Sequence, residues 1–344
     1  MGLQYNEIND AVLLTQQTLI QRGAFVDLQT DLTDHVAVRE MWQGRRHAFA
    51  GGNPWEFDVQ IDHNHSARSV ELYETDGSSI NDTMIKGTST PRHVNAHYIY
   101  DQREPAFQRG GASIVDLIET RTTAMQVSWF EYLEGKLWSK PTDSTDTKTP
   151  YGLQMYVVKN ATEGFNGGNP AGFADGVCGI SSTTYPRWAN YTGSYATVSP
   201  EDLVRKMRRM FYKINFRSVV SHAQPTIGSM KNGIYCNADT LLFMEELLES
   251  QNTNLGTDLD SQGGRVVFKS SPVIYAPKLD DESDDPVYML DWKWLAIGVL
   301  EGWENQLSAP HMLSDRHLVY RVDLDASLQM CCTNRRQQGV LYKA

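Results

Sequence analysis

Hydrophobic and polar residues follow two different spacings along this chain, one typical of strands and one typical of helices. Residues 55–62 alternate strictly between apolar and polar side chains. Because successive side chains of a strand point to opposite faces, this alternation predicts a half-buried β-strand. Two further strands are expected over Ser69–Glu74 and through Val94–Tyr100, so that residues 55–101 form a long β excursion. The apolar face of the first strand consists of Trp55, Phe57, Val59 and Ile61.

Helical spacing is clearest from Ala112 to Trp138, where apolar residues recur every three or four positions. Ser113 and Asp116 have the spacing of a capping pair at the start of this helix. A helix of this length is about 40 Å long, which is typical of a structural spine rather than of a small globular core. Pro141 follows the helix and stops it.

Other segments predict shorter elements. Helices are expected over residues 5–22 and 199–214 and after Asn237, and strands over residues 151–158, 265–268, 272–275, 287–290 and 318–325. Residues 24–50, 162–198 and 333–344 are polar or rich in Gly, and we expect an extended arm, a long ordered loop and a C-terminal arm there. Strands and helices do not alternate as they do in doubly wound enzymes, so the fold class is α+β.

Composition narrows the class of protein. The chain has 344 residues, of which 40% are hydrophobic, and a formal net charge of −11. Such an acidic chain gains no overall electrostatic attraction to nucleic acid, although one basic face could still touch it. The four cysteines form no C-x-x-C pair and are expected to be reduced thiols. We find neither a signal peptide nor a membrane-spanning stretch, and expect a soluble protein made in the cytoplasm.

Few residues suggest chemistry. His63 and His65 would share one face of a strand and could begin a metal site, but an exposed hairpin edge is the favoured interpretation. The acidic run Asp280–Asp285 lacks the spacing of a calcium loop and is expected to be a solvated loop. The glycines from Gly164 to Gly176 lack a phosphate-binding pattern. We therefore expect no catalytic residue, no cofactor and no bound metal.

The expected helix 199–214 carries a basic face that includes Arg205, Arg208 and Arg209. Three interpretations stay open for this face: an ordinary solvated surface, a contact with nucleic acid, or a contact with an acidic surface of a neighbouring subunit. Electrostatic complementarity between subunits would suit an acidic protein that assembles.

Two segments resemble a known family. The stretch Gly179-Ile-Ser-Ser-Thr-Thr-Tyr-Pro-Arg-Trp-Ala-Asn190 resembles a motif of tailed-phage major capsid proteins. The end of the long helix, Leu137-Trp-Ser-Lys-Pro141, resembles the Leu-Trp-Gly-x-Pro that ends the capsid spine helix, with Ser139 where glycine is common. The order of segments is similar to the Hong Kong 97-like capsid fold over essentially the whole chain.

The resemblance implies a division of the chain. It places an N-terminal arm at 1–49, an extended β loop at 50–105, a peripheral domain with the spine helix at 106–220, an axial domain at 221–312, and a return strand with a C-terminal arm at 313–344. It also implies hexamers and pentamers that form an icosahedral shell around double-stranded DNA, which is held without sequence-specific contacts. The shell would assemble in the host cytoplasm with a separate scaffolding protein and a portal. Packaging of the DNA would follow and give the virion.

Subunit contacts follow from the same resemblance and from the pattern. A two-stranded excursion is not stable alone in water, so the Trp55, Phe57, Val59 and Ile61 face is expected to need a neighbour. Some family members cross-link a Lys to an Asn of a neighbour, for which Lys86 and Asn334 are candidates. The alternatives are an encapsulin-type compartment, another virion component such as a decoration protein, or an α+β hydrolase.

Overall fold

The computed structural model describes residues 35–42, 46–50, 55–62, 67–73, 83–104, 111–215, 232–250, 259–261, 266–269 and 271–344. The helices are α2 (Val36–Trp42), α4 (Gly111–Trp138), α5 (Leu153–Tyr156), α6 (Leu203–Lys213) and α7 (Ala238–Ser250), with 3-10 helices η4 (Pro277–Asp281), η5 (Trp292–Trp294) and η6 (Arg335–Gln337). The class is α+β, as the pattern predicted. Among the helices of the described residues, none combines the length and the apolar character that a membrane crossing requires.

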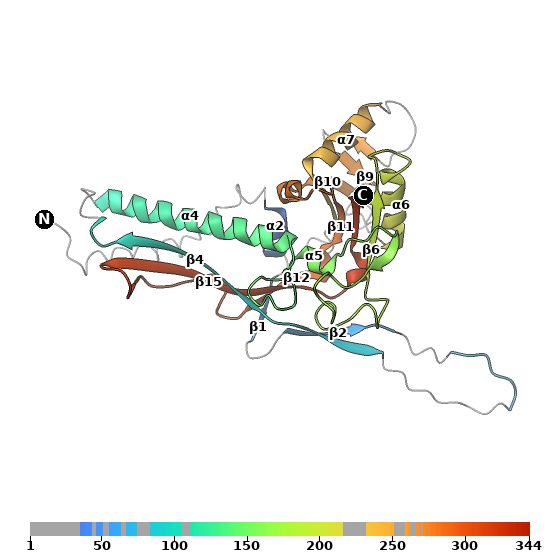
Figure 1. The fold of residues 1–344 in the computed structure, drawn as a ribbon, viewed down its shortest axis with the longest axis horizontal. Coiled ribbons are helices and arrows are strands. Elements are labelled where there is room, and N and C mark those ends of the chain that lie inside the picture. The colour runs from blue at the N-terminus through green and yellow to red at the C-terminus, as the bar shows by residue number, and fades with distance from the viewer. Residues whose placement is uncertain are drawn as a thin grey trace, which may run out of the picture.

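A long helix over a long pair of strands dominates one end of the molecule (Figure 1). The helix α4 follows strand β4 (Arg92–Asp101), and β4 pairs along all ten of its residues with strand β15 (Val319–Cys332). Side chains four residues apart on α4, from Met125 to Leu137, are buried against this layer. The predicted spine helix is therefore confirmed, although Ser113 lies inside the helix and not at its start.

The layer beneath α4 is a six-stranded sheet. Its remaining strands are β1 (Arg46–Phe49), β12 (Leu295–Leu300), β13 (Gln306–Leu307) and β14 (His311–Met312). Strand β1 runs parallel to β12, and β12 pairs with β15 in antiparallel register. The alternate residues Leu295, Ile297 and Val299 of β12 are fully buried in the main hydrophobic core.

An eight-stranded sheet forms the second large unit. Its order is β5 (Gly164–Gly167), β6 (Asn190–Tyr195), β16 (Gly339–Lys343), β11 (Val287–Asp291), β7 (Asn232–Cys236), β10 (Ser271–Tyr275), β9 (Val266–Phe268) and β8 (Leu259–Ser261). Its two faces contact different cores. Ile234 packs in the same cluster as buried residues of α6 and α7, whereas Tyr235 belongs to the main core with Trp138 at the end of α4.

A two-stranded sheet extends from the body (Figure 1). Strand β2 (Trp55–Gln60) is the predicted strand, and it pairs with β3 (Met84–Ser89). The backbone N–H of Thr88 on β3 donates to the carbonyl of Cys178 at 3.0 Å. This bond joins the hairpin to the loop that leads into the Gly179–Asn190 motif.

The excursion differs from the prediction in two respects. The expected strand Ser69–Glu74 is wrong for its described residues, because Ser69–Tyr73 are exposed and contain no strand. Strand β3 lies where no strand was expected, and half of its six residues are exposed, so these positions need no apolar side chain. The third predicted strand is β4, but it pairs with β15 rather than within the excursion.

Two further expectations are wrong. Residues 151–158 do not form a strand, and the buried turn of helix α5 occupies their centre. Residues 162–198 are not one loop, because β5 and β6 lie within them and pair with each other. The short apolar run at 151–158 fits a buried helical turn as well as a strand, so spacing alone could not distinguish them.

The two chain ends also differ from the expected arms. Helix α2 and strand β1 fold residues 36–42 and 46–49 into the main body, whereas residues 1–34, including the expected helix 5–22, lie outside the described residues. The C-terminal residues form β16, in the interior of the eight-stranded sheet between β6 and β11. Strand β16 gains hydrogen bonds on both edges and buries Val340 and Leu341, so this end of the chain is part of the fold.

Sheet membership does not follow the boundaries expected for the axial unit at 221–312. Strand β12 lies within that range but belongs to the six-stranded sheet, and β16 lies outside it but belongs to the eight-stranded sheet. Helix α6 starts at Leu203 rather than at Ser199, because Asp202 is its N-cap residue. The helix after Asn237 and the strands near 265–268, 272–275, 287–290 and 318–325 are confirmed, the last one extending to Cys332.

Candidate subunit interfaces

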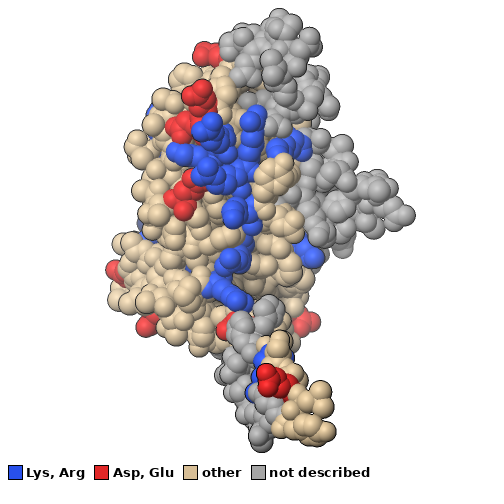
Figure 2. Space-filling view, turned by 90° about the vertical axis from the view of Figure 1, so that its right-hand side faces the viewer, with Lys and Arg blue, Asp and Glu red and all other residues tan. Residues whose placement is uncertain are grey.

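The basic face of α6 is the largest charged feature that the sequence singled out. Leu203, Met207 and Met210 are fully buried on one side of this helix, and helical geometry turns the basic residues outward. Figure 2 shows a column of Lys and Arg side chains on the side of the molecule where α6 lies. On a chain with net charge −11, such a column concentrates positive charge on one surface.

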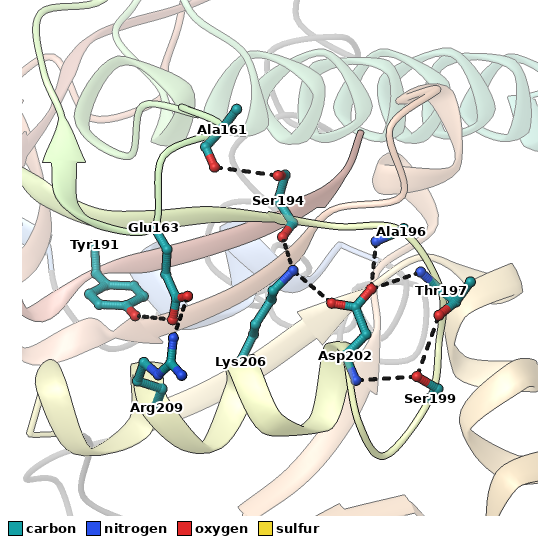
Figure 3. Close-up of polar contacts among 10 residues, drawn as sticks. All are labelled: Ala161, Glu163, Tyr191, Ser194, Ala196, Thr197, Ser199, Asp202, Lys206 and Arg209. Atoms are coloured by element: carbon teal, nitrogen blue, oxygen red, sulfur yellow. Dashed lines mark hydrogen bonds and ion pairs between the residues drawn. The ribbon is translucent and has the colours of Figure 1, made fainter.

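Two of the basic residues of α6 form ion pairs within the chain (Figure 3). Lys206 pairs with Asp202 at 2.6 Å and donates to the carbonyl of Ser194, and Arg209 pairs with Glu163 at 2.5 Å. Burial acts to raise the pKa of Asp202, but the hydrogen bonds from Lys206 and from two backbone N–H groups lower it overall. These contacts hold α6 against β6, so Arg209 has a structural partner in addition to any role at an interface.

The outermost cations of α6 have a different environment. Arg205, Arg208 and Lys213 are exposed, and Arg205 and Lys213 make no ion pair with any residue that the structure describes. An exposed cation without an acidic partner contributes little to the stability of the monomer. The side chains of Arg205 and Lys213 are therefore available to another molecule.

The apolar face of β2 packs within its own chain. Phe57 is buried in the main core, and the partly buried Trp55, Val59 and Ile61 pack against that core. The Trp55 ring stacks on Phe49 with centroids 6.3 Å apart. Strand β1 and the main core therefore cover part of this face within the chain itself. A contact between these residues and a neighbour stays a prediction.

The excursion beyond β2 and β3 exposes apolar side chains. Leu72 is 86% exposed and Tyr73 is 99% exposed, and Val70 beside them is also exposed. Residues 67–73 lie away from both large sheets in Figure 1. Adjacent exposed apolar residues are typical of a surface that another protein covers.

The two cross-linking candidates lie in ordinary surroundings. Lys86 on β3 is exposed and pairs with Glu56 on β2 at 3.2 Å. Asn334 caps η6, because its side-chain oxygen accepts the backbone N–H of Arg336 at 3.1 Å. Neither observation tests a covalent bond between subunits, which stays a prediction.

Sequence reasoning missed a fully buried arginine. Arg335 donates to the carbonyls of Tyr156, Trp188, Gly167 and Gly168 at 2.8–3.2 Å, and its cationic group lies 5.8 Å from the Trp188 ring. Burial lowers the pKa of Arg335 to about 10, so the guanidinium stays charged at neutral pH. The guanidinium thus binds carbonyls of α5, of the end of β5 and of the Gly179–Asn190 motif. It joins all three to the C-terminal segment. Nothing in the sequence distinguishes Arg335 from the exposed Arg336.

The motif from Gly179 to Asn190 is part of the same network. Asn190 is fully buried, accepts the backbone N–H of Val158 at 2.9 Å and donates to the carbonyls of Val158 and Tyr191. Buried amides that use both donors and acceptors hold two segments in one relative position. Asn190 at the end of the motif thus joins Val158 to β6.

A buried carboxylate was also missed. Glu134 on α4 accepts the backbone N–H groups of Ala37 and Val38 at 3.0 and 2.8 Å and the indole N–H of Trp138 at 2.6 Å. The first two are free donors at the start of α2, so Glu134 joins the N-terminal segment to the spine helix. Burial raises the pKa of Glu134 despite these hydrogen bonds. Ala37 and Val38 lie almost a hundred positions before Glu134, so a local sequence pattern cannot show this contact.

The acidic run Asp280–Asp285 is better satisfied than a solvated loop would be. Lys159 contacts both Glu282 and Asp284, and Asp285 accepts the Asn237 amide at 2.7 Å. The described residues contain no group of three or more His, Cys, Asp or Glu placed to hold a metal ion, and His63 and His65 lie outside them. The acidic run therefore holds β11 to its surroundings.

This architecture, with a spine helix on a long strand pair, an eight-stranded sheet and a projecting hairpin, is the Hong Kong 97-like α+β fold. Comparison of structures supports this over 90% of the chain. The capsid asymmetric unit of cyanophage A-1(L) matches with a TM-score of 0.61 at 11% identity and is covered over 92% of its own chain.

Other solved structures share the fold. The capsid of an empty GTA particle matches with a TM-score of 0.55 at 10% identity over 90% of both chains. The SrpI encapsulin of Synechococcus elongatus PCC 7942 matches with a TM-score of 0.50 at 10% identity, over 90% of this chain and 88% of the encapsulin. No protein-family model and no curated protein sequence matches the chain. The structural match establishes the fold. Sequence identities this low do not establish the function.

Proposed function

We propose that this chain is the major capsid protein of a tailed bacteriophage, a structural protein rather than an enzyme. The observation that carries the proposal is the fold shared over 90% of the chain with the capsid unit of cyanophage A-1(L). Hexamers and pentamers of the chain would form the icosahedral head around double-stranded DNA, in the virion.

The surface of the monomer supports an assembling protein. Arg205, Arg208 and Lys213 on the outer side of α6, and Val70, Leu72 and Tyr73 of the excursion, are exposed. Surfaces of different character on one chain fit heterologous contacts, which close into rings when the rotation between copies allows. Many modest contacts of this kind stabilise a shell through multivalency.

The division of labour remains part of the proposal. The excursion 50–105 would cover a neighbour, the unit with the spine helix at 106–220 would be peripheral, and 221–312 would meet its copies at the symmetry axes. The segment 313–344 would complete the peripheral unit, and residues 1–49 would be the N-terminal arm. The proposed residues of the subunit contacts are Trp55, Phe57, Val59, Ile61, Lys86, Arg205, Arg208, Arg209 and Asn334.

The partners are proposed from the same fold. A separate scaffolding protein and a portal would direct assembly in the host cytoplasm, and DNA would enter afterwards. A net charge of −11 disfavours tight DNA binding by the shell, so packaged DNA would lie against the inner face without sequence-specific contacts.

Electron microscopy of the purified protein tests the proposal directly. Negative-stain images should show uniform rings or closed shells, and light scattering should report a mass far above that of a single chain. A protein that stays a monodisperse monomer at high concentration, with or without a co-expressed scaffold, would contradict the proposal.

An encapsulin-type compartment is the second candidate, favoured by the match to the SrpI encapsulin. The content of native particles separates the two. Particles purified from their natural source should contain double-stranded DNA and a portal if the chain is a phage capsid protein. Particles that contain a packaged enzyme and no DNA would support the compartment.

A further inference from the structure

The outward face of α7 combines acidic and apolar side chains. Leu242 and Phe243 lie three and four residues after Asp239 and four and three residues before Glu246, so the four share one side of the helix. Leu242 is 56% exposed and Phe243 is 49% exposed, while Met244 on the opposite side is fully buried. The solvent face of α7 thus carries a leucine and a phenylalanine between two carboxylates.

This face has no partner within the described part of the chain. Asp239 and Glu246 are exposed and form no ion pair with any described residue. A phenylalanine and a leucine side by side on the surface of a helix gain nothing by facing water. A partner for this face should therefore be apolar at its centre and positive around it.

The outward face of α6 has these properties. Tyr212 is 71% exposed and lies among Arg205, Arg208 and Lys213, which share its side of the helix. Lys269 adds a fourth cation to this surface, because its ammonium lies 3.9 Å from the centre of the Tyr212 ring and donates to the phenol oxygen at 2.8 Å. The face of α6 is therefore an aromatic side chain surrounded by cations.

The two faces belong to two helices that cover the same side of one sheet. Helix α6 packs over β6 and β16, and its Phe211 reaches Phe268 of β9, while α7 packs over β10, β9 and β8, and both helices contribute to one hydrophobic cluster. Each copy therefore carries a positive surface on α6 and a complementary negative surface on α7. A contact between unlike surfaces of identical chains is heterologous and generates a ring if it closes.

We propose that the α6 face around Arg205, Tyr212 and Lys213 binds the α7 face around Asp239, Leu242, Phe243 and Glu246 of the adjacent copy. This inference rests on the proposed function, which requires rings of identical subunits, and adds the pair of surfaces that joins them. Charge complementarity also sets the order of the chains, because two α6 faces or two α7 faces repel each other.

A charge exchange between the two faces tests the contact. The first variant, R205E/K213E, reverses α6, and the second, D239K/E246K, reverses α7. Each should assemble with a yield of particles lower by roughly tenfold or more, since like charges then meet at every contact. The quadruple variant R205E/K213E/D239K/E246K restores attraction and should recover most of the yield.

A matched control keeps the change in net charge equal. The double variant K148E/R316E reverses two exposed cations outside α6 and should assemble like the wild-type protein. Circular dichroism and thermal unfolding of each unassembled variant should match the wild-type protein, which separates a lost contact from a lost fold. Assembly of the wild-type protein should also weaken as salt is raised, because salt screens exposed charges.

Three results would overturn the inference. The α6 variant assembles as well as the control, or the quadruple variant stays as defective as either double variant, or the α6 variant forms normal shells that hold less DNA. The last result would assign the α6 face to nucleic acid. A wild-type protein that forms no particle under any condition would instead contradict the proposed function, so the two failures are distinguishable.

Discussion

The C-terminal segment is mostly polar but buried, whereas the β excursion exposes apolar side chains to solvent. Residues 333–344 are mostly polar, yet Arg335 and Gln338 are fully buried inside the chain. Residues 67–73 include Leu72 and Tyr73, yet both side chains face solvent. Polarity therefore did not decide which segment belongs to the fold. The deciding factor is whether the segment's backbone and polar groups find partners within the chain.

The comparison teaches where neighbours are needed. The C-terminal segment satisfies its groups internally through η6 and β16, so removing its contacts should unfold the monomer. The excursion leaves apolar groups uncovered, so changing them should affect assembly while the monomer stays folded. The free energy of unfolding of the unassembled chain and the yield of particles measure these two effects separately.

Replacing Arg335 should have the largest effect on stability. Arg335→Met leaves several buried carbonyls without donors, and a loss of about 5 kcal/mol in the free energy of unfolding is expected. Denaturant unfolding of the unassembled protein measures it. The control is Arg336→Met, whose exposed side chain lies over Phe165 and should matter by less than about 1 kcal/mol. Equal losses in the two variants would contradict the assigned role of Arg335.

Replacing Glu134 should have the next largest effect. Glu134→Ala removes the acceptor for two backbone N–H groups and one indole, so a loss of about 3 kcal/mol is expected. The exposed Glu131 on the same helix provides the control, because Glu131→Ala removes a similar charge without buried partners. Hydrogen exchange at Ala37 and Val38 should accelerate in the Glu134 variant alone, and unchanged protection there would argue against the link to α2.

Glu134 also predicts a pH dependence. Burial raises its pKa in the folded chain, so the folded state holds this proton at pH values where the unfolded chain has lost it. Its contribution to stability should therefore be largest below the ordinary glutamate pKa and should fall as the pH rises through the raised value. Glu134→Gln should remove this part of the pH profile, and an identical profile in the variant would contradict the assignment.

Truncating Phe57 tests whether the β2 face packs within the chain. Phe57→Ala should cost about 2–3 kcal/mol, because Phe57 is buried but lies on a hairpin at the edge of the core. Met84 on β3 is exposed, and Met84→Ala should leave the free energy of unfolding within about 0.5 kcal/mol of wild type. A Phe57 variant as stable as the Met84 variant would mean that only a neighbouring subunit covers this face.

Changing the excursion should have the smallest effect on the monomer. Leu72→Ser with Tyr73→Ser should change the free energy of unfolding by less than about 0.5 kcal/mol, since neither side chain is covered. The same variant should form fewer particles, as counted by sedimentation and electron microscopy. Normal particle yield would show that residues 67–73 contact no neighbour.

Several elements were predictable because their signals are local. The alternation at 55–62 and the helical spacing of α4 arise from the periodicity of strands and helices, and both elements formed where the pattern placed them. The exposed cations of α6 were also predictable, because the buried Leu203, Met207 and Met210 define the opposite face. The resemblance of the Gly179–Asn190 motif pointed to the correct fold, although the motif's role in holding Arg335 was not visible.

The sequence by itself determined the α+β class, the spine helix, the acidic balance and the basic face of α6. Tertiary structure alone decided that residues 339–343 pair between β6 and β11, that Glu134 holds α2, and that β4 joins β15 rather than the excursion. Periodicity reports which side of an element is buried but not which distant segment covers it. Those partnerships depend on long-range pairing of hydrogen-bonding groups, which only the folded chain brings together.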